Sequence, residues 1–250
     1  MNKDQVIFNR KFGLIGKSLD HSFSPKYFES KFASEDINDA EYKLYPLNQI
    51  SEIRTLLSQQ INGLNVTVPY KQEIINYLDD LDEVSREIGA VNTIAIVDGK
   101  TKGYNTDVHG FKKSLLNFLE DDMDLKAMVL GTGGASNAVI YVLKKLGMDF
   151  TQISRSKSST SYDKINERMV TDHRLIINCT PLGMHPEVVS CPDIPYNYIS
   201  EKHYLFDLIY NPEKTLFLKK GESKGARITN GYMMLCIQAD KSWDIWNKEH

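Results

Sequence analysis

The amino-acid sequence predicts an α/β protein of two domains, each built around a mainly parallel β-sheet. Short β-rich runs alternate with helical patterns through the first half of the chain, and such alternation is typical of parallel sheets covered by helices. A second series of the same kind begins near Leu125. The length of 250 residues is enough for two domains that each bury a core.

In the first half of the chain, the sequence predicts five strands and two helices, followed by a helical segment at the domain boundary. Strands are expected at residues 12–15, 41–44, 64–68, 93–97 and 101–104, and helices at residues 25–32 and 50–59. Asp98-Gly99, between the last two strands, favours a tight hairpin turn. Residues 107–118 form a further helical pattern, and we place the domain boundary in or near it.

The second half repeats the pattern and begins with a fully apolar strand. Strands are expected at residues 127–130, 150–153, 175–178, 204–209 and 227–229, and helices at residues 135–146 and 233–246. The last helix could dock on either domain, and its spacing alone does not decide which.

Composition and charge argue against several classes of function. The formal net charge of −3 is small and evenly spread, so neither a nucleic-acid surface nor a membrane surface is expected. Cys179, Cys191 and Cys236 lack the spacing of a zinc site or a redox pair, and the six histidines lack metal-ligand spacing, so no metal is expected. Residues 1–12 resemble no targeting peptide and the apolar runs are short. We therefore expect a soluble cytoplasmic protein with reduced thiols.

A glycine-rich segment predicts a dinucleotide site. Gly131-Thr132-Gly133-Gly134-Ala135-Ser136 follows the strand at 127–130 and opens a helix. In this context the first glycine permits a tight turn, the second lets the backbone approach a pyrophosphate, and the helix N-terminus supplies N–H groups. Ser136 replaces the usual third glycine, but it is small enough for close packing. A glycine turn that merely joins strand to helix is the alternative; the strand–turn–helix order favours the dinucleotide site.

The end of the next strand favours NADP(H) over NAD(H). An NAD site typically carries an acidic residue about 20 residues after the glycine loop, but this chain has Ser154-Arg155-Ser156-Lys157 there. A guanidinium with flanking hydroxyls suits a 2′-phosphate. The alternative is that these cations are ordinary solvated loop residues.

Polar clusters at the strand–loop junctions of the first half suit a small polyhydroxylated substrate. They are found at residues 13–25, 65–71, 89–93 and 103–110. Buried hydroxyl groups of a substrate each need a paired donor or acceptor. Simpler explanations exist for three members: Ser24 with Pro25 fits a helix N-cap and first helical residue, Asp107 fits an N-cap before Val108, and Lys71 fits an exposed surface lysine.

These four clusters, in this order and ahead of the glycine loop, closely resemble the shikimate dehydrogenase family. The resemblance continues at residues 178–184, 207–215 and 230–239, and it extends over roughly residues 13–246. Single motifs of this kind are moderately specific, whereas the whole series in family order is very specific.

The resemblance implies NADPH-dependent, reversible reduction of 3-dehydroshikimate to shikimate by a monomer or homodimer. It implies a substrate domain of residues 1–106 plus 230–250, against which the last helix docks, and a Rossmann-type NADP domain of residues 107–229. The implied catalytic acid–base pair is Lys71 and Asp107. The implied substrate contacts are Ser22, Ser24, Thr67, Asn92, Tyr210 and Gln238. The implied cofactor contacts are Gly131, Thr132, Gly133, Gly134, Ala135, Ser154, Arg155, Ser156, Leu208 and Gly231.

The chain departs from the family pattern, and two other functions stay open. Ser154 stands where the family usually has Asn, which removes one amide donor from the 2′-phosphate site, and Thr132 stands where it often has Ala. A quinate dehydrogenase is one alternative, although serines at both 22 and 24 favour shikimate. A nucleotide-sensing protein without catalysis is the other, and the presence of both Lys71 and Asp107 argues against it.

Overall fold

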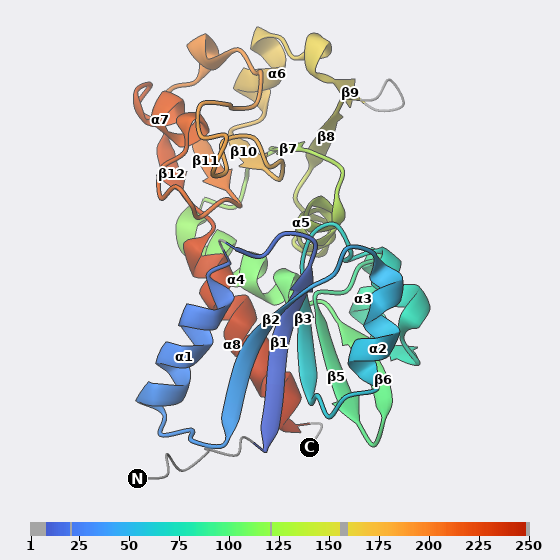
Figure 1. Ribbon diagram of the computed structural model, residues 1–250. Helices are drawn as coiled ribbons and strands as arrows, with labels where there is room; N and C mark the ends of the chain where they lie inside the picture. Colours follow the sequence, from blue (N-terminus) through green and yellow to red (C-terminus); the bar gives the residue numbers. More distant parts are fainter. Residues whose placement is uncertain (1–8, 21, 121, 156–159, 249–250) are drawn as a thin grey trace. The chain divides into compact units, whose positions relative to one another are not determined.

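The computed structural model describes residues 9–20, 22–120, 122–155 and 160–248, and Figure 1 traces their helices and strands. The chain divides into two compact units. The first contains the residues up to Thr106 together with those from Ala239 onward, and the second contains Asp107–Gln238. Each unit has a six-stranded sheet covered by helices, which confirms the predicted α/β class.

The first unit has a mixed sheet of order β2-β1-β3-β5-β6-β4. Its strands are β1 (Arg10–Gly16), β2 (Ala40–Pro46), β3 (Gly63–Val66), β4 (Asp80–Leu81), β5 (Thr93–Val97) and β6 (Lys100–Tyr104). Its helices are α1 (Ser24–Ser34), α2 (Ile53–Leu57) and α3 (Glu83–Ile88), with 3-10 turns η1 (Ile50–Glu52) and η2 (Glu73–Tyr77). β1 is parallel to β2 and β3, whereas β5 is antiparallel to β3 and β6. The predicted hairpin turn is confirmed, since Asp98 and Gly99 both have positive φ, 50° and 74°.

Alternation along β1 gives the first sheet two apolar faces, because successive strand residues point to opposite sides. Phe12 packs in a cluster with residues of α1 and of the last helix, α8 (Tyr232–Lys248). Ile15 packs in a second cluster with residues of α2 and η2. In Figure 1, α1 and α8 accordingly lie on one side of this sheet and α2 on the other.

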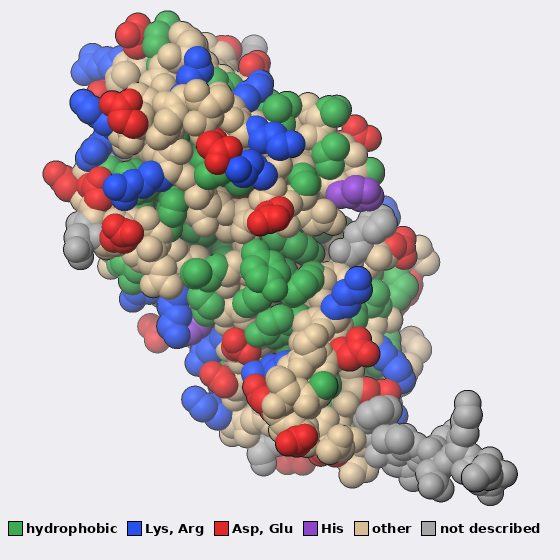
Figure 2. Space-filling view, turned by 90° about the vertical axis from the view of Figure 1, so that its left-hand side faces the viewer, with side chains coloured by type: hydrophobic (Ala, Val, Ile, Leu, Met, Phe, Trp, Pro, Cys, Tyr) green, Lys and Arg blue, Asp and Glu red, His purple; other side chains and the backbone are tan. Residues whose placement is uncertain are grey.

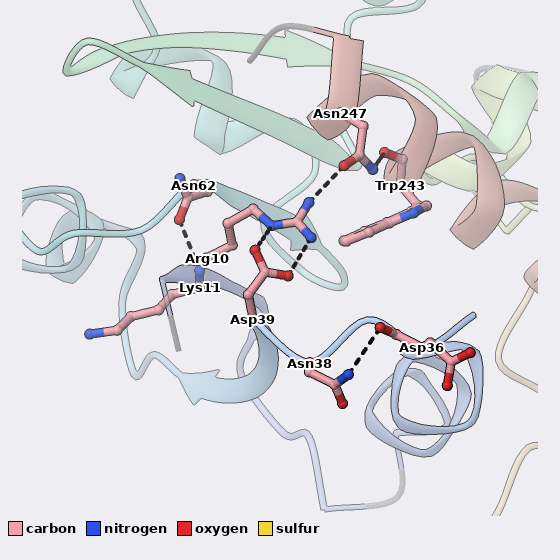
Figure 3. A network of polar contacts seen from close by, with 8 residues as sticks. All are labelled: Arg10, Lys11, Asp36, Asn38, Asp39, Asn62, Trp243 and Asn247. Atoms are coloured by element: carbon pink, nitrogen blue, oxygen red, sulfur yellow. Dashed lines mark hydrogen bonds and ion pairs between the residues drawn. The ribbon is translucent and has the colours of Figure 1, made fainter. Parts of the chain in front are cut away.

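Arg10 ties the last turn of α8 to the start of the first sheet (Figure 3). Its guanidinium donates to both carboxylate oxygens of Asp39, at 2.9 and 2.7 Å, and to Oδ1 of Asn247 at 2.8 Å. The same group lies 5.1 Å from the ring centroid of Trp243. The fork between Arg10 and Asp39 is the favourable form of an ion pair, and it orients the guanidinium toward α8. Helix α8 is therefore anchored to this unit by a hydrogen bond and a cation–π contact as well as by apolar contacts.

The second unit has an all-parallel sheet of order β12-β11-β10-β7-β8-β9. Its strands are β7 (Ala127–Leu130), β8 (Phe150–Ser154), β9 (Thr160–Ser161), β10 (Leu175–Asn178), β11 (Tyr204–Asp207) and β12 (Arg227–Thr229). Its helices are α4 (Asp107–Leu119), α5 (Gly134–Lys145), α6 (Glu167–Asp172) and α7 (Leu216–Glu222), with 3-10 turns η3 (Tyr162–Lys164) and η4 (Tyr196–Tyr198). The chain starts the sheet at its centre with β7, adds β8 and β9 on one side, and then adds β10, β11 and β12 on the other. This is the strand order of a dinucleotide-binding domain, so the predicted Rossmann-type fold is confirmed.

The order of the second sheet reverses between β7 and β10. In sheets of this kind, ligands bind outside the carboxyl ends of the strands at such a switch point. β7 is buried throughout, with Val129 facing the cluster that includes α4 and α5 and Leu130 facing the cluster that includes α6 and α7. The buried strand gives the loop that follows it a rigid base.

The structure differs from the sequence-based expectations at several element ends. Helix α1 begins at Ser24 itself with Phe23 as N-cap, so the expected N-cap at Ser24 is wrong. The Ser22 hydroxyl accepts the Ser24 N–H at 3.3 Å and supplies the acceptor instead. The expected helix at 50–59 is split into η1 and α2. Helix α4 starts at Asp107, as the helical pattern at 107–118 predicted, so Asp107 is the first helical residue and not an N-cap before Val108.

Charged side chains of both signs are interspersed on the surface shown in Figure 2. Such a distribution matches the small formal net charge of −3 and produces little long-range field. Electrostatic attraction of a ligand therefore has to come from individual groups at a site.

Candidate active site

The side chains expected to bind substrate from the first unit lie at one edge of its sheet. The carboxyl ends of β1 and β3 share this edge because the two strands are parallel, and the amino end of β5 joins them because β5 is antiparallel to β3. Ser22 and Ser24 follow β1, Thr67 and Lys71 follow β3, and Asn92 directly precedes β5. The topology therefore brings these five predicted residues to loops at a common edge.

The backbone around Lys71 is fixed on both sides. Its carbonyl oxygen accepts the N–H of Val91 at 2.7 Å, which joins the loop after β3 to the segment before β5. The neighbouring Tyr70 is buried, and its hydroxyl donates to the carbonyl oxygen of Leu47 at 2.8 Å. Lys71 is half-buried, which differs from the exposed surface lysine considered as the simpler explanation. A fixed backbone is what precise placement of a reacting group requires.

Asn92 is oriented by Thr106. The Thr106 N–H donates to Oδ1 of Asn92 at 2.7 Å, and Nδ2 of Asn92 lies 3.0 Å from the Thr106 hydroxyl. A backbone N–H can only donate, so this contact fixes which atom of the amide is the oxygen. Asp107 follows Thr106 directly, as the first residue of α4, and is 5% exposed. The same contacts thus fix the Asn92 amide and the backbone from which Asp107 extends.

A buried polar cluster lies behind Asn92 and contains one residue that the sequence reasoning missed. Nδ2 of Asn65 donates to the Ser242 hydroxyl at 2.9 Å, and that hydroxyl lies 2.8 Å from the Thr93 hydroxyl. Oδ1 of Asn65 accepts the Tyr42 hydroxyl at 2.8 Å, and burial raises the pKa of Tyr42. Ser242 follows Gln238 by one helical turn of α8, and this spacing places both residues on one helix face. The spacing from the predicted substrate contact Gln238 could therefore have identified Ser242 from the sequence.

The expected cofactor residues of the second unit, together with the expected substrate contact Tyr210, lie at the carboxyl edge of its sheet. The glycine loop follows β7, Arg155 follows β8, Leu208 and Tyr210 follow β11, and Gly231 follows β12. Ser154 is the last residue of β8 and is buried. Because all these strands are parallel, their carboxyl ends share one edge. Gln238 lies instead on α8, where its amide donates to the carbonyl oxygen of Leu235 at 3.1 Å. Ser156 lies outside the described residues.

The glycine loop has the shape that a pyrophosphate requires. Gly131 has φ 118°, and a Cβ there would lie 3.3 Å from the carbonyl group of Cys179 on the neighbouring strand end. The carbonyl oxygen of Gly131 accepts the Gln152 amide at 2.9 Å. Gly133, the N-cap of α5, carries no capping side chain, and the space over its Cα is open. The N-terminal N–H groups of α5 are therefore available to an anion.

Ser136 takes the place of the usual third glycine in the loop. Its side chain is fully buried, and its hydroxyl donates to the carbonyl oxygen of Gly133 at 2.7 Å. A serine side chain is therefore small enough for α5 to pack closely on the sheet, and its hydrogen bond to Gly133 holds the turn in place.

Asp207 is a buried carboxylate at the same edge. It is 0% exposed and accepts the Ile209 N–H and the Asn178 amide, both at 3.0 Å, and the Thr215 hydroxyl at 2.6 Å. Burial raises the pKa of Asp207 to about 6 despite these three donors. The contact with Ile209 also ends β11 at Asp207, which is why the strand stops short of the expected residue 209.

We expect Asp207 to make the protein less stable as pH rises. The native state binds this proton more tightly than the unfolded chain does, so its contribution is full below the ordinary pKa of 3.8 and is lost as pH rises through about 6. Between pH 5 and 7 the loss is about 1.4 kcal/mol. Urea denaturation of the wild type and of Asp207→Asn at both pH values measures it. An equal pH dependence in the two proteins would contradict the assignment.

No group of three or more His, Cys, Asp or Glu side chains that could hold a metal ion occurs among the residues described. No helix in the described part of the chain is sufficiently long and apolar to span a membrane.

A family model and a curated relative both match this chain, and they indicate the same family. Residues 14–94 match the model of the shikimate dehydrogenase substrate binding domain. A Clostridium beijerinckii protein named shikimate dehydrogenase (NADP(+)) is 40% identical over 250 residues, covering 95% of this chain and 92% of that protein.

Solved structures are similar over almost the whole chain. A shikimate 5-dehydrogenase from Thermus thermophilus, in complex with NADP(H) and shikimate, is 25% identical with a TM-score of 0.83. A quinate dehydrogenase from Corynebacterium glutamicum, in complex with NAD, is also 25% identical, with a TM-score of 0.85. Each similarity covers 96% of this chain and 94% of the other.

Proposed function

Since this chain belongs to the shikimate dehydrogenase family, it is an NADP-dependent oxidoreductase, and we propose that it interconverts 3-dehydroshikimate and shikimate with Lys71 and Asp107 as the acid–base pair. The observation that carries the proposal is the polar edge of the first unit, where the sheet topology gathers Thr67, Lys71 and Asn92. These side chains supply the hydroxyl, ammonium and amide groups that a polyhydroxylated ketone needs.

Lys71 acts on the oxygen of the reacting carbonyl group. As an ammonium it stabilises the negative charge that develops on this oxygen and then donates a proton to it. In the direction of shikimate oxidation the same amine accepts the proton of the hydroxyl group. Asp107 orients the Lys71 side chain and accepts a hydrogen bond from the adjacent substrate hydroxyl. Its low exposure strengthens both interactions.

The other substrate contacts fix the ring. Ser22, Ser24 and Tyr210 hold the carboxylate, and Thr67, Asn92 and Gln238 hold the hydroxyl groups. The fixed amide of Asn92 supports this assignment, because a preset donor and acceptor discriminates between hydroxyl arrangements.

The second unit holds NADP(H), which supplies the hydride when bound. The glycine loop from Gly131 to Ala135 binds the pyrophosphate through backbone N–H groups. Arg155, with Ser154 and Ser156, binds the 2′-phosphate, and Leu208 and Gly231 flank the nicotinamide. The open space over Gly133 and the uncapped start of α5 fit this group.

The test is the absorbance of reduced nicotinamide after purified protein is mixed with shikimate and NADP⁺. We expect a rise with this pair, and a smaller one with NAD⁺. Quinate is the competing substrate, because a quinate dehydrogenase has a similar fold. A preference for quinate with NAD⁺ would overturn the proposed substrate, and NADPH binding without turnover of either acid would indicate a non-catalytic protein.

Replacing Arg155 with alanine is expected to raise KM for NADP⁺ by about 10- to 100-fold and to leave KM for NAD⁺ unchanged. A hydrogen bond to a charged group contributes about 1.5–3 kcal/mol, and NAD⁺ lacks the 2′-phosphate that receives it. Lys144→Ala is the matched control, since this exposed lysine lies at the opposite end of α5 from the glycine loop. An equal rise in KM for both cofactors would rule out a 2′-phosphate contact.

A further inference from the structure

Asp207 joins three loops at the carboxyl edge of the second sheet. Its three donors come from different segments: Asn178 ends β10, Ile209 follows β11, and Thr215 caps α7. The carboxylate is the common acceptor, since Oδ1 receives both Asn178 and Ile209, and Oδ2 receives Thr215. A fully buried carboxylate lowers the stability of the folded protein at neutral pH. Stabilisation of the fold therefore does not explain why an aspartate occupies this position.

Two of the residues that donate to Asp207, Asn178 and Thr215, make further hydrogen bonds that shape the loops beside them. Oδ1 of Asn178 accepts both the N–H and the hydroxyl of Thr180, at 3.0 and 2.7 Å, which shapes the turn after β10. The hydroxyl of Thr215 also accepts the Leu218 N–H as the cap of α7, so the loop from β11 is held at both ends. Asp207 therefore fixes the loops after β10 and β11 together.

The third loop joins through the backbone of Ile209. The carbonyl oxygen of Ile209 accepts the N–H of Gly231 at 3.0 Å. At Gly231 the two loops approach so closely that a Cβ would overlap the carbonyl oxygen of Leu208. The positions of Leu208 and Gly231 are thus set by the same short chain of contacts that begins at the Asp207 carboxylate.

We propose that Asp207 is a positioning residue for hydride transfer, which holds Leu208 and Gly231 in the arrangement that receives the nicotinamide and does not itself touch the ligand. The inference rests on the proposed placement of the nicotinamide beside these two residues. It assigns a role to a buried carboxylate that the acid–base mechanism does not use. The hydrogen bonds that begin at Asp207 lead to Asn178, Ile209, Thr215 and Gly231, whereas the adenosine end of the site is proposed at Arg155 and the start of α5.

The experiment compares two ligands that share the adenosine end. NADP⁺ carries a nicotinamide, whereas adenosine 2′,5′-bisphosphate does not. In Asp207→Ala we expect the affinity for NADP⁺, measured by calorimetry, to fall by about tenfold and the affinity for the bisphosphate to stay within about twofold. We expect kcat to fall by about 100-fold through misplacement of the reacting groups.

Two further variants separate positioning from stability. Asp207→Asn keeps the oxygen that receives Asn178 and Ile209, and its amide can donate to the Thr215 hydroxyl, so kcat is expected within about threefold of wild type. Val170→Ala trims a fully buried side chain of α6 in the same unit and destabilises it, and its apolar cluster contains neither Leu208 nor Gly231. It should leave the ratio of the two affinities unchanged.

Three results would overturn the proposal: equal weakening of both ligands in Asp207→Ala, no change in either, or an altered ratio in Val170→Ala. The binding ratio needs no turnover, so it decides the role of Asp207 even if the wild type fails to oxidise shikimate. A failure of the proposed function is recognised separately, by a wild type that binds NADP⁺ and has no activity.

Discussion

Replacing Lys71 with alanine is expected to lower kcat for shikimate oxidation by about three orders of magnitude while KM for shikimate changes by less than about fivefold. General acid–base catalysis contributes about 10²- to 10⁴-fold, and the loss of the charge on the developing oxyanion adds to it. KM is largely preserved because the carboxylate and the other hydroxyl groups are bound by different side chains. Initial rates over a range of shikimate concentrations at saturating NADP⁺ measure both constants.

Two variants sharpen this test. Lys71→Arg keeps a positive charge but carries no proton that it releases at neutral pH, so it should recover the electrostatic part of the rate and not the proton transfer. Lys43→Ala removes an exposed lysine on β2, whose side chain is 59% exposed, and should leave the rate unchanged. Near-normal turnover in Lys71→Ala would contradict the acid–base assignment, as would full recovery by arginine.

Replacing Trp246 with alanine is expected to lower the free energy of unfolding by about 3–5 kcal/mol. Trp246 is 1% exposed, and its ring is stacked on Phe12 at a centroid distance of 4.7 Å and lies 5.6 Å from Phe28. Its Nε1–H donates to the carbonyl oxygen of Ile94 at 2.9 Å. The substitution leaves a cavity between α1, α8 and the first sheet, and it leaves a buried carbonyl group without its donor.

Urea denaturation followed by far-ultraviolet circular dichroism measures the change, because the substitution removes a fluorophore. Trp246→Phe keeps an aromatic ring and loses the hydrogen bond, so it should cost about 1–3 kcal/mol, less than alanine. If alanine and phenylalanine destabilised the protein equally, packing would not be the main contribution of this side chain.

The strands and the glycine loop were predictable because their signals are local. The apolar run of β7 and the glycines after it determine both the strand and the turn, whatever the rest of the chain does. The hairpin at Asp98-Gly99 is equally local. The short strands β4 and β9 were missed, because two residues carry no periodicity and pair only through their neighbours.

The residues that support the candidate site were not predictable from local patterns. Ser242 and Asn65 are 177 positions apart in the sequence and meet only in the folded first unit. Asp207 shares the segment 207–215 with two of its donors, but the third, Asn178, ends the neighbouring strand and lies 29 positions earlier in the sequence. The state of assembly, a monomer or homodimer, and the cytoplasmic location stay predictions, as do the ligand roles of the site residues.

Helix α8 has a consequence for the order in which the protein matures during its synthesis. The first compact unit needs the residues from Ala239 onward, and among them Trp246 belongs to its core. The second unit lies between the two parts of the first, so all of it leaves the ribosome earlier. At typical rates of translation the interval between Thr106 and Trp246 is on the order of ten seconds. During that time only α1 covers the apolar face that α8 later completes, while the second unit can already fold.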